Sequence, residues 1–268
     1  MFHTSRIDYS HLDRPEILRV LFHPRSEYGG ATKPPGAMDV LIPVEADVVV
    51  GGRFHMAHPS GPNILFFHGN GEIVADYDEM GPLYNRLGLN FLAVDYRGYG
   101  RSTGSPAITA MMQDCHAIFD FLLKWLENQG RTGSLIVMGR SLGSASALEL
   151  ASRYKERLSG LIVESGFAYT GPLLKLLGVN PEAVGFKEQE GLGNLEKIRT
   201  WDKPALIIHA EFDHIIPFSE GQALYHACPS PDKTLLKVQG ANHNDIFVRG
   251  FNEYMDAVKE LAERTAGR

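Results

Sequence analysis

Three side chains that lie far apart in the sequence have the types that nucleophilic catalysis by a serine requires. They are Ser141, Asp213 and His243. A serine hydroxyl is nearly inert at neutral pH, so it needs a base to take its proton, an acid to orient that base, and hydrogen-bond donors for an oxyanion. The sequence offers a candidate for each role, in the order Ser, Asp, His.

The candidate nucleophile lies in residues 139–143, which read Gly-Arg-Ser-Leu-Gly, a G-x-S-x-G motif. The apolar run Leu135–Met138 precedes the motif and is typical of a buried strand, whereas residues 144–152 carry Ala, Leu and Glu at helical spacing. A strand that turns into a helix so quickly needs small residues two before and two after the serine. We therefore expect Ser141 at the apex of a tight turn, beside the positive end of a helix.

A second G-x-S-x-G motif occurs at residues 100–104, around Ser102, so the motif alone does not identify the nucleophile. No predicted strand ends at its first glycine. Pro106 disfavours a helix that begins at Ser102. We therefore interpret Ser102 as a loop residue and Ser141 as the nucleophile.

The candidate acid is Asp213, which follows the apolar run 205–209. A carboxylate there would accept the imidazole N–H and hold the useful tautomer. The structural alternative is a loop aspartate or a cap for the next helix. Glu211, two residues earlier, is a rival for the same role, and we favour Asp213.

The candidate base is His243, in the stretch Gly-Ala-Asn-His-Asn-Asp at residues 240–245. The chain has 11 histidines, and most histidines are surface or packing residues. His243 is distinguished by its position after the last predicted strand and before the last predicted helix. Asn244 or Asp245 could cap that helix.

The oxyanion donors that we expect are the backbone N–H groups of Leu142, at the helix start, and Asn70. Asn70 lies in His-Gly-Asn-Gly at residues 68–71, directly after a predicted strand. Gly71 is the alternative donor, and an ordinary glycine-rich turn is the structural alternative. We interpret His68 as structural rather than as a second base.

Other charged and apolar residues have two interpretations each. Arg140 and Arg97 could bind an anionic substrate group, although ion pairing within the protein is favoured for both. Asp95 ends a predicted strand, and we expect it to be structural. Residues Leu173–Val179 could line an acyl pocket or form an amphipathic helix over the core.

The elements that position these residues alternate in type along the chain. We expect an antiparallel hairpin at the sheet edge, then parallel strands with helices on both faces and the site at their carboxyl ends. Residues 166–202 interrupt the alternation and are interpreted as an insertion. The predicted strands are 39–43, 48–58, 64–67, 91–94, 135–138, 161–163, 205–209 and 234–238. The predicted helices are 75–87, 109–128, 144–152, 220–227 and 245–264.

Composition favours one α/β domain over residues 1–268 and argues against several kinds of partner. The net charge is −6, without a basic block, so no nucleic-acid partner is expected. No apolar run reaches the 18 or so residues that span a bilayer, so no stable membrane insertion is expected. The N-terminus is polar without an apolar signal core, which predicts a cytoplasmic protein. Cys115 and Cys228 have no metal or redox spacing and are expected to be buried free thiols.

Five motifs in order resemble the α/β-hydrolase superfamily. They are HGNG at 68–71, DYRGYGRSTGSP at 95–106, GRSLGS at 139–144, the Asp213 loop and GANHND at 240–245. The branch they resemble includes the depalmitoylating protein thioesterases and many bacterial hydrolases. The resemblance implies an eight-stranded α/β-hydrolase fold, a short cap at 166–202 and a triad of Ser141, Asp213 and His243.

The sequence also departs from those thioesterases in one respect. They carry a Cys-rich, lipidated N-terminus, and here no Cys precedes Cys115, which argues against a membrane-bound palmitoyl substrate. We expect a serine hydrolase that cleaves a small-molecule acyl ester or thioester through an acyl-enzyme, without a metal or organic cofactor. An amidase or peptidase using the same triad, and a non-catalytic binding module that keeps the fold, are the alternatives. The sequence makes no prediction of oligomeric state.

Overall fold

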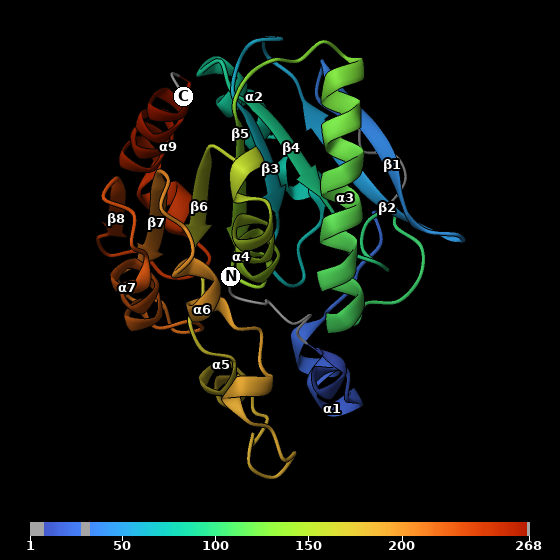
Figure 1. Ribbon diagram of the computed structural model, residues 1–268, viewed down its shortest axis with the longest axis vertical. Helices are drawn as coiled ribbons and strands as arrows, with labels where there is room; N and C mark the ends of the chain where they lie inside the picture. Colours follow the sequence, from blue (N-terminus) through green and yellow to red (C-terminus); the bar gives the residue numbers. More distant parts are fainter. Residues whose placement is uncertain (1–7, 28–32, 267–268) are drawn as a thin grey trace.

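The computed structural model describes residues 8–27 and 33–266, and in that part of the chain eight strands form one sheet (Figure 1). The polar N-terminus lies partly outside the described residues. The strand order is β1-β2-β4-β3-β5-β6-β7-β8. The strands are β1 (Ala37–Glu45), β2 (Val48–His55), β3 (Asn63–Phe67), β4 (Asn90–Val94), β5 (Leu135–Arg140), β6 (Gly160–Glu164), β7 (Ala205–Ala210) and β8 (Lys233–Val238).

The sheet is mostly parallel, as predicted. Strands β1 and β2 form an antiparallel hairpin at one edge, and β2 pairs antiparallel with β4. The remaining neighbours, from β4 through β3, β5, β6 and β7 to β8, pair in parallel. The carboxyl ends of the parallel strands therefore meet at one end of the sheet, which is where such sheets carry their sites.

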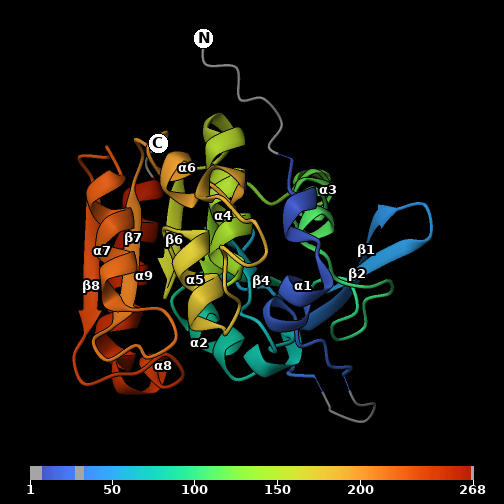
Figure 2. The same ribbon diagram turned by 90° about the horizontal axis from the view of Figure 1, so that it is seen from below.

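Both faces of the sheet are apolar, because alternate residues of each central strand point to opposite sides. In β3, Leu65 and Phe67 join one buried cluster, whereas Ile64 and Phe66 join the other. Helices cover both clusters and make a three-layer arrangement (Figure 2). The first face is covered by α3 (Ile108–Asn128), α4 (Gly143–Arg153), α6 (Asn194–Ile198) and α7 (Phe218–Ala227), and the second by α2 (Met80–Arg86) and α9 (Phe251–Thr265).

The helix predicted over 75–87 is wrong as a single element. The structure has a 3₁₀ turn, η2 (Val74–Tyr77), and then the separate helix α2. The physical reason is Pro82, which has no N–H and clashes with the preceding turn inside a helix. In the first turn of α2, Pro82 needs no hydrogen bond, so the helix restarts just before it.

The last helix, predicted over 245–264, is also divided. It consists of α8 (Ile246–Arg249) and α9, with Gly250 between them. A Cβ at Gly250 would lie 2.6 Å from a methyl group of Val238, so only glycine lets the chain pass this close to β8. Cys115 and Cys228 are free and buried, as predicted.

Two short helices lie at the same end of the molecule, α1 (Pro15–Leu21) and α5 (Thr170–Leu176) (Figures 1 and 2). Helix α5 belongs to the predicted insertion, residues 166–202, which we call the cap segment. The Arg14 guanidinium, at the start of α1, donates a hydrogen bond to the Val184 carbonyl of the cap segment. The remaining short turns are η1 (Ser10–Leu12), η3 (Lys155–Arg157) and η4 (Glu188–Glu190).

The segment before α1 is attached to the body of the protein by a buried polar cluster. The Tyr9 hydroxyl donates to Glu149 of α4 at 3.0 Å, and the Lys197 ammonium of α6 lies 2.8 Å from the same carboxylate. Lys197 also donates to the Tyr9 oxygen at 3.1 Å. These contacts hold the N-terminal segment against α4 and α6, and so place α1 beside the carboxyl ends of the strands.

The glycines of the 139–143 motif are required by close packing, which generates a prediction. A Cβ at Gly143 would overlap the backbone carbonyl of Phe67. Gly143→Ala should therefore destabilise the protein well beyond the roughly 1–2 kcal/mol that a positive φ costs an ordinary residue. Gly178→Ala is the control, because Gly178 has φ +86° and no described atom within 4 Å of its Cβ position. The free energy of unfolding of both variants can be measured by urea denaturation. Equal losses for Gly143→Ala and Gly178→Ala would contradict this prediction.

Candidate active site

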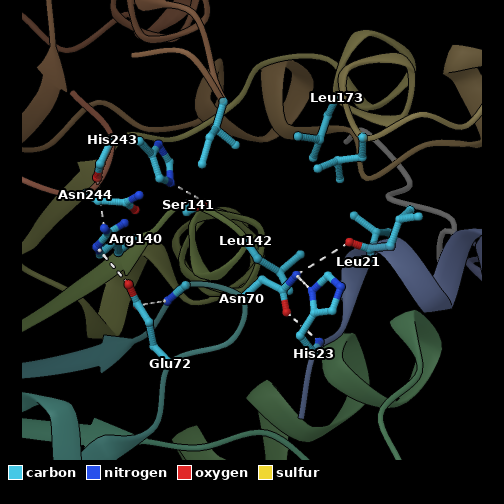
Figure 3. Close-up of a pocket in the computed structure, with 14 residues that line it drawn as sticks. Leu21, His23, Asn70, Glu72, Arg140, Ser141, Leu142, Leu173, His243 and Asn244 are labelled. Carbon is cyan, nitrogen blue, oxygen red and sulfur yellow. Dashed lines mark hydrogen bonds and ion pairs between the residues drawn. The ribbon is translucent and has the colours of Figure 1, made fainter. Parts of the chain in front are cut away.

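Ser141 lies at the apex of the turn between β5 and α4. Its φ is 51°, in the left-handed region that ordinary residues rarely adopt. Hydrogen bonds on both sides hold this conformation. The Ser141 N–H donates to the Glu164 carbonyl at 2.8 Å, and the Ser141 carbonyl accepts from the Ser144 hydroxyl at 2.6 Å. The side chain is thereby turned away from the backbone and into the cavity (Figure 3).

The structure brings Ser141, His243 and Asp213 together in one hydrogen-bonded series. The Nε2 atom of His243 lies 3.2 Å from the Ser141 Oγ, and its Nδ1 lies 2.7 Å from the Asp213 Oδ2. His243 follows β8 and Asp213 follows β7, so each side chain reaches the site from the carboxyl end of its own strand. All three residues are almost completely buried.

The Asp213 carboxylate is held by its own loop. Its Oδ1 accepts hydrogen bonds from the backbone N–H groups of Ile215, at 3.0 Å, and Ile216, at 2.8 Å. Burial alone would raise the pKa of Asp213, but the hydrogen bond and charge of His243, with the Ile216 N–H, lower the pKa below its usual value. The carboxylate is therefore ionised at neutral pH and accepts the Nδ1–H of His243.

The residues considered as alternatives to Ser141, Asp213 and His243 have other interaction partners in the structure. Glu211 pairs with Lys237 at 3.0 Å and accepts the Gly240 N–H at 2.9 Å. The buried His68 lies 3.3 Å from the buried Asp95, and within the described residues neither side chain has a hydrogen bond to Ser141, in agreement with the expected structural role. Ser102 lies in a loop, as predicted, where its hydroxyl accepts the Gly51 N–H at 2.9 Å.

The two expected oxyanion donors border the cavity beside Ser141. Within the described residues, the backbone N–H groups of Asn70 and Leu142 donate to no protein acceptor. The Asn70 side chain accepts hydrogen bonds from the His23 N–H at 2.7 Å and the Tyr99 hydroxyl at 2.8 Å, which fix its loop. The alternative donor, Gly71, is not among the residues that line the cavity.

A cavity of about 260 Å³ opens at Ser141 (Figure 3). Its wall combines apolar residues with polar ones. The apolar residues come from α1, the turn between β5 and α4, α5 with the residue after it, and the Asp213 loop. They are Val20, Leu21, Leu142, Leu173, Leu177 and Ile215. The polar residues are His23, Asn70, Glu72, Arg140, Ser141, His243 and Asn244.

The sequence interpretation missed the contribution of α1 to this wall. Val20 and Leu21 belong to the short apolar stretch 17–22, which carries no motif, and His23 follows it. Ile215 lies two residues after Asp213 without a signal of its own. Leu173 and Leu177 do line the cavity, as one of the two interpretations of 173–179 proposed. A short amphipathic helix has the same pattern whether it faces a core or a cavity, so only its position shows which.

The two arginines are both ion-paired within the protein. Arg97 makes two hydrogen bonds of 2.7 Å with Asp114 and one of 2.7 Å with Glu45. Arg140 is buried among Glu72, Glu164 and the His243 loop.

In the described residues, no group of three or more His, Cys, Asp and Glu side chains is arranged to hold a metal ion. None of the described helices is both long and apolar enough to cross a bilayer.

Comparison with known proteins agrees with this fold and motif order. Residues 59–181 match the family model described as "Serine aminopeptidase, S33". The human alpha/beta hydrolase domain-containing protein 17B is 31% identical over 210 residues, and the mouse protein 17C is 31% identical over 222 residues. The chain belongs to the α/β-hydrolase superfamily. These alignments cover 75% and 79% of this α/β-hydrolase but only 66% and 63% of the two relatives.

Solved structures of other α/β-hydrolases share the fold. The Pyrococcus furiosus esterase Pf2001 has a TM-score of 0.72 and 21% sequence identity, with 91% of this chain and 99% of that chain covered. The Paleococcus ferrophilus monoacylglycerol lipase has a TM-score of 0.63 and 20% identity, with 81% and 99% covered. At these identities the likeness shows the fold.

The lowered pKa of Asp213 predicts how its contribution to stability depends on pH. The contribution is complete above the usual carboxyl value of 3.8 and is lost as the pH falls through the lower folded-state pKa. Asp213→Asn should therefore lower the urea midpoint at pH 7, and the difference from wild type should shrink as the pH falls towards about 3. Asp202→Asn is a control with a smaller effect, because the Asp202–Lys155 pair is exposed. A difference that stays constant with pH would contradict this.

Proposed function

We propose that this α/β-hydrolase is a serine hydrolase that cleaves carboxylic esters or thioesters through an acyl-enzyme on Ser141. The observation that carries the proposal is the series Ser141–His243–Asp213, with contacts of 3.2 and 2.7 Å beside an open cavity. The names of the esterase and the lipase with the same fold are consistent with it.

In the proposed reaction, the Ser141 Oγ attacks the substrate carbonyl carbon while His243 Nε2 takes the hydroxyl proton. The ionised Asp213 keeps the neutral imidazole in the tautomer whose Nε2 is free to accept, and then stabilises the imidazolium. The N–H groups of Asn70 and Leu142 donate to the carbonyl oxygen as it becomes negative. His243 returns the proton to the departing alcohol or thiol, and a water molecule releases the acid by the same steps in reverse.

The shape of the cavity supports an apolar acyl group as the substrate's acid portion. Valine and leucine side chains from α1 and from residues 173–177 line the cavity, and an acyl chain bound against them would be removed from water. The cap segment supplies Leu173 and Leu177 to that wall, and we propose that it covers the bound chain. The polar residues of the wall would face the alcohol or thiol portion.

Replacing the nucleophile is the direct test of this proposal. Ser141→Ala should lower kcat for p-nitrophenyl esters by several orders of magnitude, because only binding and the oxyanion donors would remain. It should also abolish covalent labelling by a fluorophosphonate. Ser102→Ala, from the second G-x-S-x-G motif, is the matched control and should keep both properties. If the folded wild type neither hydrolyses any ester nor reacts with the probe, a non-catalytic binding module is favoured instead.

The proposed acyl side of the cavity predicts a change in chain-length preference. Leu173→Trp should reduce kcat/KM for p-nitrophenyl esters of long acids about tenfold or more, because the indole fills the space between α5 and α1. Hydrolysis of the acetate should change little. Leu176→Trp, on the same helix but half-exposed to solvent, should leave the profile from acetate to palmitate unchanged. An equal loss on all esters for Leu173→Trp would contradict this assignment.

A further inference from the structure

The guanidinium of Arg140 lies in the polar part of the cavity wall and contacts residues of two loops. Arg140 immediately precedes Ser141 and is only 8% exposed. Its Nη2 donates to the backbone carbonyl of His243 at 2.9 Å, and its Nε lies 3.3 Å from the Glu72 Oε1 and 3.3 Å from the Glu164 Oε1. Figure 3 shows Arg140 between Glu72 and the loop that carries His243 and Asn244.

Glu72 connects Arg140 to residues 68–71, the loop that carries Asn70 and that we call the oxyanion loop. Its Oε2 accepts the backbone N–H of Gly69 at 2.6 Å and the hydroxyl of Tyr77 at 2.6 Å. Gly69 directly precedes Asn70, the proposed oxyanion donor. Burial alone would raise the pKa of Glu72, but the positive charge of Arg140 and the Tyr77 hydroxyl bring the pKa below its usual value. Glu72 is therefore a charged acceptor between Arg140 and the loop.

Glu164 connects the same cation to the nucleophile. Its backbone carbonyl accepts the Ser141 N–H at 2.8 Å, and its side-chain Oε2 accepts the Tyr254 hydroxyl at 2.6 Å. Burial raises the pKa of this carboxyl, partly offset by Arg140. One guanidinium thus faces two carboxyl groups, so the cluster presents no free positive charge to bind an anionic substrate.

We propose that Arg140 is a positioning residue that holds the oxyanion loop and the His243 loop at a fixed spacing around Ser141. This inference rests on the proposed function. A planar guanidinium can direct separate N–H groups at the His243 carbonyl and at Glu72, whereas an ammonium concentrates its charge at one point. Arg140 acts on the reacting atoms through His243 and Asn70, since its own side chain is occupied by these contacts.

The test replaces Arg140 by lysine, which keeps the positive charge but removes the planar guanidinium and its separate N–H groups. Arg140→Lys should lower kcat for a p-nitrophenyl ester by about 10- to 100-fold, because a small misplacement of reacting groups is costly. KM should change little, because the acyl wall is untouched. The rate of fluorophosphonate labelling should fall in parallel with kcat. Arg97→Lys is the matched control, because Arg97, like Arg140, is ion-paired with two carboxylates but lies outside the site. A comparable loss of thermal stability in this variant should leave kcat unchanged.

A second variant separates positioning from general destabilisation. Glu72→Gln leaves Arg140 balanced by Glu164 and should reproduce the fall in kcat. The double variant should lose hardly more activity than the more impaired single variant, because both break one connection. The positioning role would be overturned by an unchanged kcat in Arg140→Lys, by an effect confined to KM, or by additive losses in the double variant. In each of these cases, turnover by the wild type would leave the proposed function standing. A wild type that neither turns over ester nor labels would overturn both.

Discussion

The structure depends on the close approach of β5 and α4 at the turn that carries Ser141. A Cβ at Gly139 would overlap the backbone of Gly143, and one at Gly143 would overlap the carbonyl of Phe67 in β3. The helix therefore starts directly against the carboxyl ends of two neighbouring strands. This contact forces Ser141 into its φ of 51° and directs the side chain away from the core. The position of the cavity follows, because the neighbouring strands end at the same level.

Around this turn, the protein separates apolar stabilisation from polar positioning. The two faces of the sheet are covered by clusters of aliphatic and aromatic side chains. The buried charges of Arg140, Glu72 and Glu164 lie instead at the carboxyl end of the sheet, where loops meet. Loops have few backbone hydrogen bonds of their own, so a charged cluster gives them a defined geometry that apolar packing alone would not. Such a cluster is expensive to bury, and its retention here is consistent with a role in holding the site.

Sequence reasoning succeeded for the sheet because buried strands have a strong local signature. Short apolar runs such as Leu135–Met138, bounded by glycine, gave all eight strands within a few residues of their observed limits. It failed where one residue interrupts a helical pattern. Pro82 divides the helix predicted over 75–87, and Gly250 divides the last helix, although the apolar periodicity continues across both. The periodicity of the sequence shows which side chains are apolar. The helix breaks depend instead on the missing N–H of Pro82 and the missing Cβ of Gly250, which periodicity does not measure.

The order of the motifs by itself predicted the fold and the meeting of Ser141, Asp213 and His243 at one end of the sheet, because each follows a strand and parallel strands end together. It could not show the polar link from Arg140 to the His243 carbonyl and Glu72, nor the wall built by α1 and α5. Those contacts join residues far apart in the sequence; Arg140 and His243, for example, are 103 positions apart. The local conformational preferences of either residue therefore cannot predict the contact. Only tertiary packing brings a cation beneath two loops, and only its position decides whether an apolar helix lines a cavity or covers a core.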